Sequence, residues 1–317
     1  MREFVIGKND AGQRLDKFIS KAVPAMPPSM LYKCIRLKKI KVNMKRAVPE
    51  QKLAEGDIVR FFVRDEFFGT PVNDETALLR IKPNLDIIFE DENIMILNKR
   101  PGVLVHSDEA GNENTLITHV IAYLAQKGEY KPEEEQSFTP ALCNRIDRNT
   151  GGLVIAAKNA EALREMNELI KNGKVHKSYL CAVHGTPSPS RGRLRGWLIK
   201  DAKANTVTVT DKKRDGAKEC ITDYRVLASK NGSSLVEVDL ITGRTHQIRA
   251  QFAHIGHSLL GDGKYGVNRK DREKGYKYQA LYAYRVSFDV EDGLLSYLNG
   301  KEFRLPEGTV WFEKEYR

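Results

Sequence analysis

Strand-like segments outnumber helix-like segments in residues 85–317, and most of the links between them are short. Apolar or alternating runs predict strands over residues 94–99, 153–157, 179–185, 206–210, 223–227, 235–241 and 281–290. Helical periodicity predicts helices over residues 115–125 and 160–171, the second ending at Gly173. This pattern predicts an α+β domain built on a mainly antiparallel mixed sheet with flanking helices.

A smaller α/β unit is predicted ahead of this domain, in residues 12–62. A short amphipathic helix is expected to open at Gly12, and a second helix, running through Lys38, is expected to be capped by Ser29. Strands are predicted at 40–43 and 58–63. Residues 64–84 mix Asp, Glu, Gly, Pro and Asn with little periodicity, which is typical of a linker. We therefore expect domains at 1–63 and 85–317, joined by a linker at 64–84.

The chain carries a net charge of +10, most of it in the first 63 residues. That stretch contains 14 lysines and arginines against 6 aspartates and glutamates. Such concentrated positive charge indicates a surface that binds a polyanion. No strongly amphipathic helix with bulky apolar anchors accompanies it, so nucleic acid is favoured over a membrane surface.

The densest basic run lies between Lys33 and Arg46, where seven basic residues occur without an acid. The simplest interpretation of such a run is a solvated helix face. Its density, and its place on a predicted helix–turn–strand unit, favour contact with the phosphates of a nucleic acid.

The cysteines and the hydropathy pattern indicate a cytoplasmic protein. Cys34, Cys143, Cys181 and Cys220 are far apart and form no C-x-x-C pair, so reduced thiols are expected and zinc held by paired cysteines is excluded. No apolar run approaches the roughly 20 residues of a membrane helix, and the N-terminus lacks the apolar core of a signal peptide. We expect a monomer in the cytoplasm.

Asp147 lies between Arg145 and Arg148, ahead of a Thr-Gly-Gly turn and the apolar run at 153–157. Nearby positive charge favours the ionised form of a carboxyl group. An ionised carboxylate at the end of a strand is a candidate nucleophile or base. The alternative is an ordinary surface ion pair beside a turn. The other motifs of the chain favour the first interpretation.

Two further segments carry candidate functional residues: a strand-like segment with Tyr179, and Gly-Arg-Thr-His-Gln-Ile-Arg over residues 243–249. His246, His254 and His257 raise the alternative of a metal site. Their spacing gives no pair on one helix face, and no carboxylate or cysteine set completes the site, so we predict no metal. The turn at 261–263 lacks the Gly-Lys-Ser/Thr of a phosphate loop and is expected to shape a pocket wall instead.

Residues 1–63 resemble the S-four-like RNA-binding domain, a small domain named for a ribosomal protein. The resemblance rests on Arg14-Leu15-Asp16, on residues 35–43 and on Gly56-Asp57, in that order. The sequence departs from this family at two places. Lys38-Lys39 stand where a glycine turn is common, and Met44 stands where glycine usually follows the asparagine.

Residues 85–317 resemble the RluA-type pseudouridine synthases. The resemblance rests on the Arg-Ile-Asp-x-x-Thr-x-Gly-Leu segment around Asp147 and on the Gly-Arg-Thr-His-Gln-Ile-Arg segment. Asn144 replaces the usual histidine and Gly151 replaces the usual serine. The resemblance implies an enzyme that isomerises specific uridines of RNA to pseudouridine and needs no cofactor.

The resemblance also implies roles for individual residues. Asp147 is the catalytic carboxylate, Arg249 pairs with it, and Tyr179 lines the uracil pocket as a base or proton relay. Arg145 enters the space that the flipped uridine leaves. Contacts with substrate or RNA are expected from Arg244, His246, Gln247, Lys33, Arg36, Lys38, Lys39 and Lys41.

The reaction explains why such residue types are needed. Isomerisation breaks a carbon–nitrogen glycosidic bond and makes a carbon–carbon bond to the same ring, which requires no redox agent and no metal. An ionised carboxylate can attack the ribose, attack the base or take a proton from the sugar, and these alternatives stay open. An aromatic face can hold the detached uracil, and a hydroxyl can move the proton that carbon-5 loses. A stacked base is out of reach, so the nucleotide must flip out.

Two basic clusters in the larger domain are candidates for an RNA cradle, although each is also compatible with a solvated loop. At least one is expected to contact the RNA backbone. The first cluster contains Arg191, Arg193, Arg195, Lys200 and Lys203, and the second contains Lys212, Lys213, Arg214 and Lys218.

Ribosomal RNA of the large subunit is the expected substrate, because an S-four-like domain in this family accompanies ribosomal targets more often than transfer RNA. Two alternatives stay open: a synthase that modifies transfer RNA, and a non-catalytic RNA-binding protein of ribosome assembly. The second is disfavoured, because such a protein has little physical reason to keep an arginine-paired carboxylate.

Overall fold

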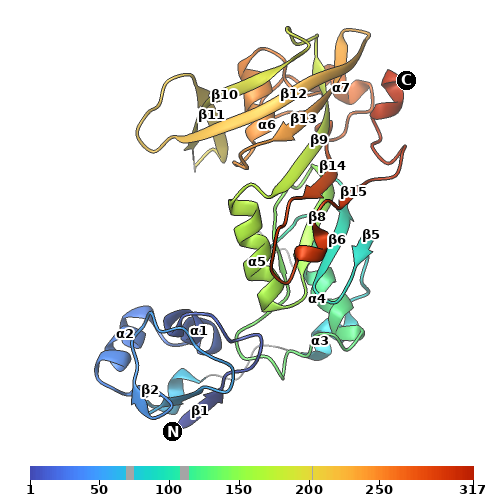
Figure 1. Cartoon of the computed structure of the whole chain (residues 1–317). Helices are drawn as coiled ribbons and strands as arrows, with labels where there is room; N and C mark the ends of the chain where they lie inside the picture. The colour runs from blue at the N-terminus through green and yellow to red at the C-terminus, as the bar shows by residue number, and fades with distance from the viewer. Residues whose placement is uncertain (69–74, 108–113, 202) are drawn as a thin grey trace. The chain divides into compact units, whose positions relative to one another are not determined.

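The computed structural model of the chain describes residues 1–68, 75–107, 114–201 and 203–317 (Figure 1). The chain divides into two compact units. Unit 1 comprises Met1–Asn84, Ile117–Ala141 and Ala157–Arg164, and unit 2 comprises Leu85–Leu116, Leu142–Ala156 and Glu165–Arg317. The domain limits expected from the sequence, 1–63 and 85–317, stay a prediction.

Unit 1 opens with a small sheet and two helices that share one core. Within the described residues the sheet has four antiparallel strands in the order β1-β4-β2-β3. Leu15, Phe18, Ile40 and Phe61 are fully buried between the sheet and the helices. The elements are β1 (Arg2–Val5), α1 (Leu15–Ala22), α2 (Pro28–Arg36), β2 (Ile40–Val42), β3 (Lys45–Arg46) and β4 (Ile58–Phe61).

The ends of α2 differ from the sequence expectation. The helix begins at Pro28, and no side chain caps it, so the predicted Ser29 cap is wrong. Proline suits the first helical position because its φ is already helical and its missing N–H is not needed there. The helix ends at Arg36, and Lys38 then takes a left-handed φ of 59°.

Part of the expected linker is structured. The η1 turn (Asp65–Phe67) leads to Phe68, whose ring centroid lies 5.4 Å from that of Phe61. After residues 69–74, which lie outside the described residues, the chain forms α3 (Glu75–Arg80). Unit 1 also contains most of α4 (Leu116–Gln126) and the first part of α5 (Ala160–Lys171), so both predicted helices are confirmed.

Unit 2 is built on one large sheet. Its described residues form 11 strands, in the order β11-β10-β12-β13-β9-β14-β8-β6-β5, with β15 beside β14 and β7 beside β8. The strands from β11 to β14 pair antiparallel, whereas β8 runs parallel to β14. The predicted α+β fold with a mainly antiparallel mixed sheet is therefore confirmed.

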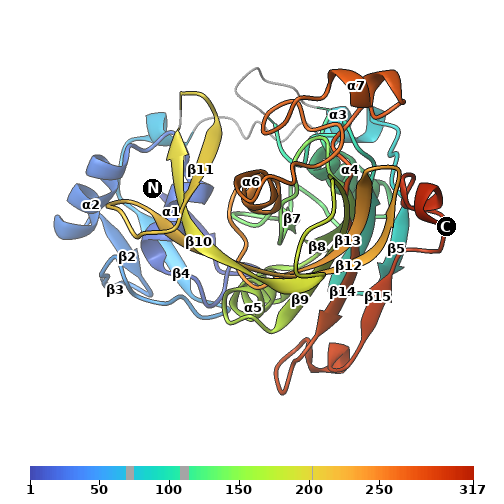
Figure 2. The same ribbon diagram turned by 90° about the horizontal axis from the view of Figure 1, so that it is seen from above.

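The strands of this sheet are β5 (Ile87–Glu90), β6 (Ile94–Lys99), β7 (Ala141–Leu142), β8 (Gly151–Ala157), β9 (Val175–His184), β10 (Arg191–Asp201), β11 (Thr206–Thr210), β12 (Lys218–Lys230), β13 (Ser233–Leu240), β14 (Leu281–Phe288) and β15 (Glu302–Arg304). The sheet is strongly curved, and α6 (Gln247–His254) lies on its concave side, against β10 and β11 (Figure 2). The remaining helices are α7 (Arg269–Glu273), η2 (Ser296–Leu298) and η3 (Glu313–Tyr316). None of the helices in the described ranges is long and apolar enough to span a membrane.

The strand β10 was not expected, because its sequence looks like a basic loop. Arginines alternate with inward-facing residues, and the acids of β12 neutralise two of them. Arg193 donates to both oxygens of Asp223 at 2.6 and 2.7 Å, and Arg195 donates to Glu219 at 2.7 Å. The interpretation of residues 191–195 as a loop is wrong, and their charge is largely balanced within the sheet.

Candidate active site

The segment that precedes Asp147 is held alongside β8 by two hydrogen bonds, one between backbone groups and one to a side chain. Cys143 N–H donates to the carbonyl of Ile155 at 2.7 Å, and Ile155 N–H donates to the side-chain oxygen of Asn144 at 2.8 Å. Asn144 thus takes the place of a strand residue, which explains why an amide is suitable where the family usually has histidine. A turn then follows, in which Thr150 N–H donates to the carbonyl of Asp147 at 3.1 Å.

Arg249, on α6, is hydrogen-bonded to Asp147 as the resemblance implies. Its Nη1 donates to Oδ2 of Asp147 at 2.7 Å. Its Nε and Nη2 donate to the two oxygens of Asp262 at 2.7 and 2.9 Å. Burial alone would raise the pKa of Asp262, but Arg249 and the backbone N–H of Lys264 hold that pKa below its usual value.

Asp262 was not assigned this function from the sequence, where it was expected only to shape the pocket wall. Its side chain is fully buried, and a buried carboxylate requires a charged partner. Both oxygens of Asp262 bind the Nε–Nη2 edge of the guanidinium, which leaves Nη1 of Arg249 directed at Asp147. The signal in the sequence was an acid between two glycines, which is compatible with many turns.

His246 lies beside the same carboxylate, with Nε2 at 3.8 Å from Oδ2 of Asp147. Its Nδ1 is 2.8 Å from the hydroxyl of Tyr265, and that hydroxyl accepts a hydrogen bond from Val207 N–H at 2.9 Å. Burial and the charge of Arg249 lower the pKa of His246, with Asp147 opposing, so the ring is neutral near pH 7.

The neighbours of His246 also determine its tautomer. The Tyr265 hydroxyl already accepts one hydrogen bond, so its own proton can be donated to Nδ1. The ring proton then lies on Nε2, where it faces the negative charge of Asp147. The opposite tautomer would direct the Nε2 lone pair at a carboxylate. We therefore assign the Nε2–H form.

Tyr179, on β9, contributes a buried phenol close enough to Asp147 for their charges to interact. Burial raises the pKa of Tyr179, and the negative charge of Asp147 raises it further. The side chain is 6% exposed, and none of the described residues hydrogen-bonds its hydroxyl. The phenol therefore stays protonated at neutral pH and keeps its hydroxyl for another molecule.

Lys99, at the end of β6, is a residue near the site that the sequence analysis did not identify. Its ammonium group donates to the carbonyls of Arg100, Val103 and Arg148 at 3.1, 2.9 and 2.9 Å. Burial lowers the pKa of Lys99 to about 7, while Asp147 opposes that shift. These bonds join the turn after β6 to the residue that follows Asp147.

Gln247 is placed inside the protein rather than on an RNA-binding surface. It is 2% exposed, its Nε2 donates to Ile221 and Thr222, and its Oε1 accepts from Thr242 and Arg244. No hydrogen-bonding capacity is left for RNA, so the predicted contact is replaced by a positioning role at the start of α6. Arg244 itself is exposed, and its Nε donates to the carbonyl of Glu219.

Comparisons with known proteins identify the family of the chain. A family model described as RNA pseudouridylate synthase matches residues 93–254. A protein of Mycoplasma genitalium named an uncharacterized RNA pseudouridine synthase is 33% identical, over 90% of this chain and 88% of the relative. Ribosomal large subunit pseudouridine synthase C of Yersinia pestis is 30% identical, over 90% of this chain and 86% of the relative. The solved structure of human RNA pseudouridylate synthase domain containing 1 is 22% identical and has a TM-score of 0.56, over 72% of this chain and 87% of that one, which supports the fold.

The chain belongs to the RNA pseudouridylate synthase family. It is therefore an isomerase that acts on uridine in RNA, and the predicted enzyme class is confirmed. The residues that the sequence analysis singled out lie in both units of the synthase.

Arg145 of the synthase is exposed two residues before Asp147. Burial lowers the pKa of the nearby His106, and the positive charge of Arg145 lowers it further. The sequence analysis did not consider His106. In the described part of the chain no carboxylate forms an ion pair with Arg145. Its guanidinium is therefore available to RNA, as the resemblance implies.

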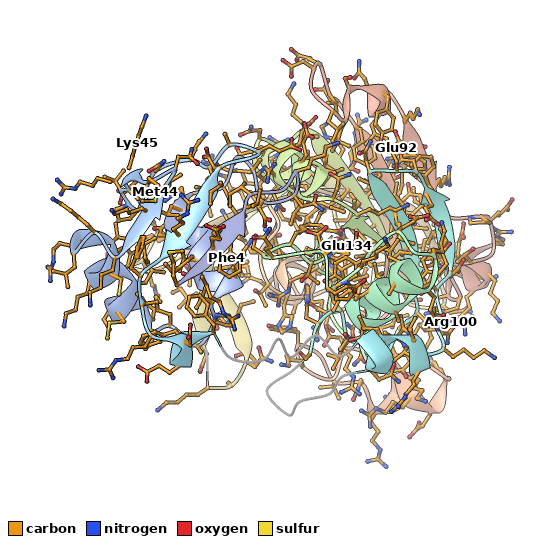
Figure 3. The ribbon with its side chains drawn as sticks, turned by 90° about the horizontal axis from the view of Figure 1, so that it is seen from below. Phe4, Met44, Lys45, Glu92, Arg100 and Glu134 are labelled. Atoms are coloured by element: carbon orange, nitrogen blue, oxygen red, sulfur yellow. The ribbon has the colours of Figure 1, made fainter. Side chains whose placement is uncertain are left out.

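Four of the five basic residues predicted to bind RNA in unit 1 are exposed. Lys33, Arg36, Lys38 and Lys39 are exposed, and Lys41 is partly buried with its ammonium 5.4 Å from the centre of the Phe62 ring. Among the residues that the structure describes, no acid forms an ion pair with any of the five. Met44 and Lys45, labelled in Figure 3, lie at the outside of the same unit.

Proposed function

We propose that the synthase modifies uridines of large-subunit ribosomal RNA, with Asp147 as the residue that acts on the glycosidic bond. The observation that carries this proposal is the arrangement of Asp147. Arg249 holds its Oδ2 at 2.7 Å, and no donor among the described residues occupies its Oδ1. Oδ1 is then the atom that meets the substrate, and the side chain is 25% exposed, enough to be reached.

Tyr179 serves in this proposal as a wall of the uracil pocket and as a proton relay. When the bond between ribose C1′ and uracil N1 breaks, uracil stays in the pocket and turns. C1′ then bonds to C5, C5 loses its proton, and N1 gains one. Because burial raises the pKa of the Tyr179 phenol, a relay that passes protons is favoured over a phenolate base.

Ribosomal RNA is favoured over transfer RNA on two grounds. The relatives at about 30% identity include several whose names specify the large ribosomal subunit. Unit 1 adds a run of exposed cations without described acidic partners, which suits an extended RNA substrate. All groups invoked at the reaction centre lie in unit 2 of one chain, so a monomer is sufficient for the proposed reaction, and we propose the cytoplasm as its location.

Tritium release tests this function. RNA labelled at C5 of uracil is incubated with wild-type protein or with Asp147→Asn, which keeps the shape of the side chain and removes its charge. We expect release from unmodified large-subunit ribosomal RNA with the wild type alone. Binding of RNA by Asp147→Asn should stay within a few-fold of the wild type, because phosphate contacts dominate affinity.

Transfer RNA transcripts, labelled in the same way, provide the comparison substrate. Release from these transcripts but not from ribosomal RNA would replace the proposed substrate. Release by Asp147→Asn at the wild-type rate would remove Asp147 from the reaction.

A further inference from the structure

Residues 263–278 form an unusually basic exposed segment in unit 2, here called the basic segment. It carries six exposed cations, one exposed acid (Glu273) and one buried acid (Asp271). Among the described residues, the only ion pair that these cations make joins Arg269 to Glu273 at 3.7 Å. The cations are Lys264, Arg269, Lys270, Arg272, Lys274 and Lys277. Their positive charge is therefore largely unbalanced.

The first end of the basic segment is fixed to the reaction centre. It follows Asp262 directly, and Asp262 binds Arg249 through two hydrogen bonds. Arg249 in turn donates to Asp147. Asp262 also accepts a hydrogen bond from Lys264 N–H at 2.9 Å, which fixes the start of the segment.

The second end is fixed to the turn after Asp147. Gln279, which follows the segment, donates to the hydroxyl of Thr150 at 3.2 Å. Tyr278 packs so closely on Gly102 that a Cβ there would lie 2.7 Å from its hydroxyl. Gly102 N–H donates to the carbonyl of Arg148 at 2.8 Å. The two ends therefore lie against partners of Asp147 and against residues 148–150.

The middle of the segment is fixed through Asp271, on α7. This carboxylate is 3% exposed, accepts a hydrogen bond from Gly261 N–H at 2.8 Å and lies 3.1 Å from Nε2 of His184. Asp271 thus holds α7 next to the residue that precedes Asp262. In Figure 2 the orange segment that contains α7 lies at the surface of unit 2. The exposed cations are presented by a backbone that is anchored at three places.

We propose that the basic segment binds the RNA backbone on either side of the target uridine. This proposal rests on the proposed function of Asp147. A uridine that flips toward Asp147 stays joined to its neighbours, so the flanking phosphates must lie near the residues that surround the carboxylate. Exposed lysines and arginines without acidic partners attract such phosphates, and release of counterions makes the attraction dependent on salt.

The arginines of β10 do not offer an equal surface, although the sequence suggested them. Arg193 and Arg195 are already paired with Asp223 and Glu219. An RNA phosphate would have to compete with these carboxylates. This difference supplies a control in which the same number of charges is removed from another exposed site.

The experiment measures binding of a large-subunit ribosomal RNA transcript against salt concentration. The test variant is Lys270→Gln with Arg272→Gln, and the control is Arg193→Gln with Arg195→Gln, each in the full chain. For the test variant we expect the slope of log K against log salt concentration to be shallower by about 1.4. Each of the two lost contacts with single-strand phosphates contributes about 0.7 to that slope. The control should stay near the wild-type slope.

Two results would overturn the proposal: an unchanged slope in the test variant, or equal losses in test and control. Single-turnover tritium release at saturating enzyme is measured in parallel for the control variant, and it should stay near the wild-type rate because Arg193 and Arg195 lie outside the reaction centre and outside the basic segment. A wild-type protein that releases no tritium contradicts the proposed reaction, whereas the salt slopes still decide whether the basic segment binds RNA.

Discussion

The residues around Asp147 illustrate how a single side chain can be oriented through groups that do not contact it directly. Asp262 fixes the Nε–Nη2 edge of Arg249, and Tyr265 fixes the proton of His246. Both effects converge on Oδ2 of Asp147 and leave Oδ1 open. In the proposed reaction, Oδ1 is thus the free oxygen because of hydrogen bonds made one residue away from Asp147.

Tyr265→Phe tests the second of these effects, because it keeps the ring that stacks near Arg249 and removes only the hydroxyl. Nitrogen-15 NMR of the imidazole should show the Nε2–H form of His246 in the wild type and a mixture of tautomers in the variant. Loss of one such hydrogen bond, about 1 to 1.5 kcal/mol, should lower kcat about tenfold without changing KM. An unchanged tautomer in Tyr265→Phe would contradict the assignment, whatever the activity.

Met44 illustrates a departure from the family pattern that the backbone does not favour. Asn43 and Met44 take φ values of 51° and 64° in the turn between β2 and β3, as a tight hairpin turn demands. Met44→Gly should raise the free energy of unfolding by about 1 kcal/mol, because the left-handed conformation is strained for methionine. Thermal denaturation checks this, with Lys45→Gly as a control that should lower stability. A destabilised Met44→Gly protein would contradict the argument.

At the scale of elements, the parallel pairing of β8 with β14 depends on two glycines. A Cβ at Gly151 would lie 2.3 Å from the ring of Tyr282, and a Cβ at Gly152 would lie 2.1 Å from the carbonyl of Ala283. Gly152 also has a φ of 112°. The replacement of the family's usual serine by Gly151 is therefore explained by the space that Tyr282 occupies.

Gly151→Ser tests this pairing. The added side chain should force β8 and β14 apart and lower the free energy of unfolding by about 1 to 3 kcal/mol, the usual range for an overpacked site. Gly151→Ser combined with Tyr282→Leu should recover part of the loss, which denaturant titrations of the single and double variants would reveal. If the two changes are simply additive, the steric explanation fails.

At the scale of the whole molecule, positive charge occurs in both units, and the two groups of cations should affect the reaction differently. The cations of unit 1 lie on α2, on β2 and in the turn between them, whereas the basic segment is anchored around Asp147. Contacts with phosphates position the RNA, while the reaction depends on the groups at the base. Loss of charge in unit 1 should therefore reduce affinity and leave the chemical step intact.

Lys38→Gln with Lys39→Gln tests this division. Affinity for the large-subunit ribosomal RNA transcript should fall, and the salt dependence should become shallower by about 1.4 for two lost single-strand contacts. Single-turnover tritium release at saturating enzyme should match the wild type. Lys171→Gln with Lys314→Gln removes two exposed cations elsewhere and should change neither value. A slower chemical step in the Lys38 and Lys39 variant would contradict the division.

Local patterns in the sequence were sufficient to predict most of the elements and the central residues. Periodicity located α5, β11 and the strands that run through Tyr179 and Val154, because burial of one face leaves a regular pattern in the chain. The paired motifs around Asp147 and Arg249 indicated the family, and both residues lie in one site. β10 was missed because its exposed arginines hide the alternation.

Only the tertiary structure decided which polar groups have partners. Residues far apart in sequence, such as Asp147 and Arg249 or Lys99 and Arg148, meet through folding, and no local pattern encodes their distance. For the same reason the sequence assigned Gln247 to RNA and Arg193 to a basic cradle, whereas the fold satisfies Gln247 inside the protein and pairs the exposed Arg193 with Asp223. Composition and periodicity report which residues are buried, but hydrogen bonds and ion pairs depend on geometry that only the folded chain defines.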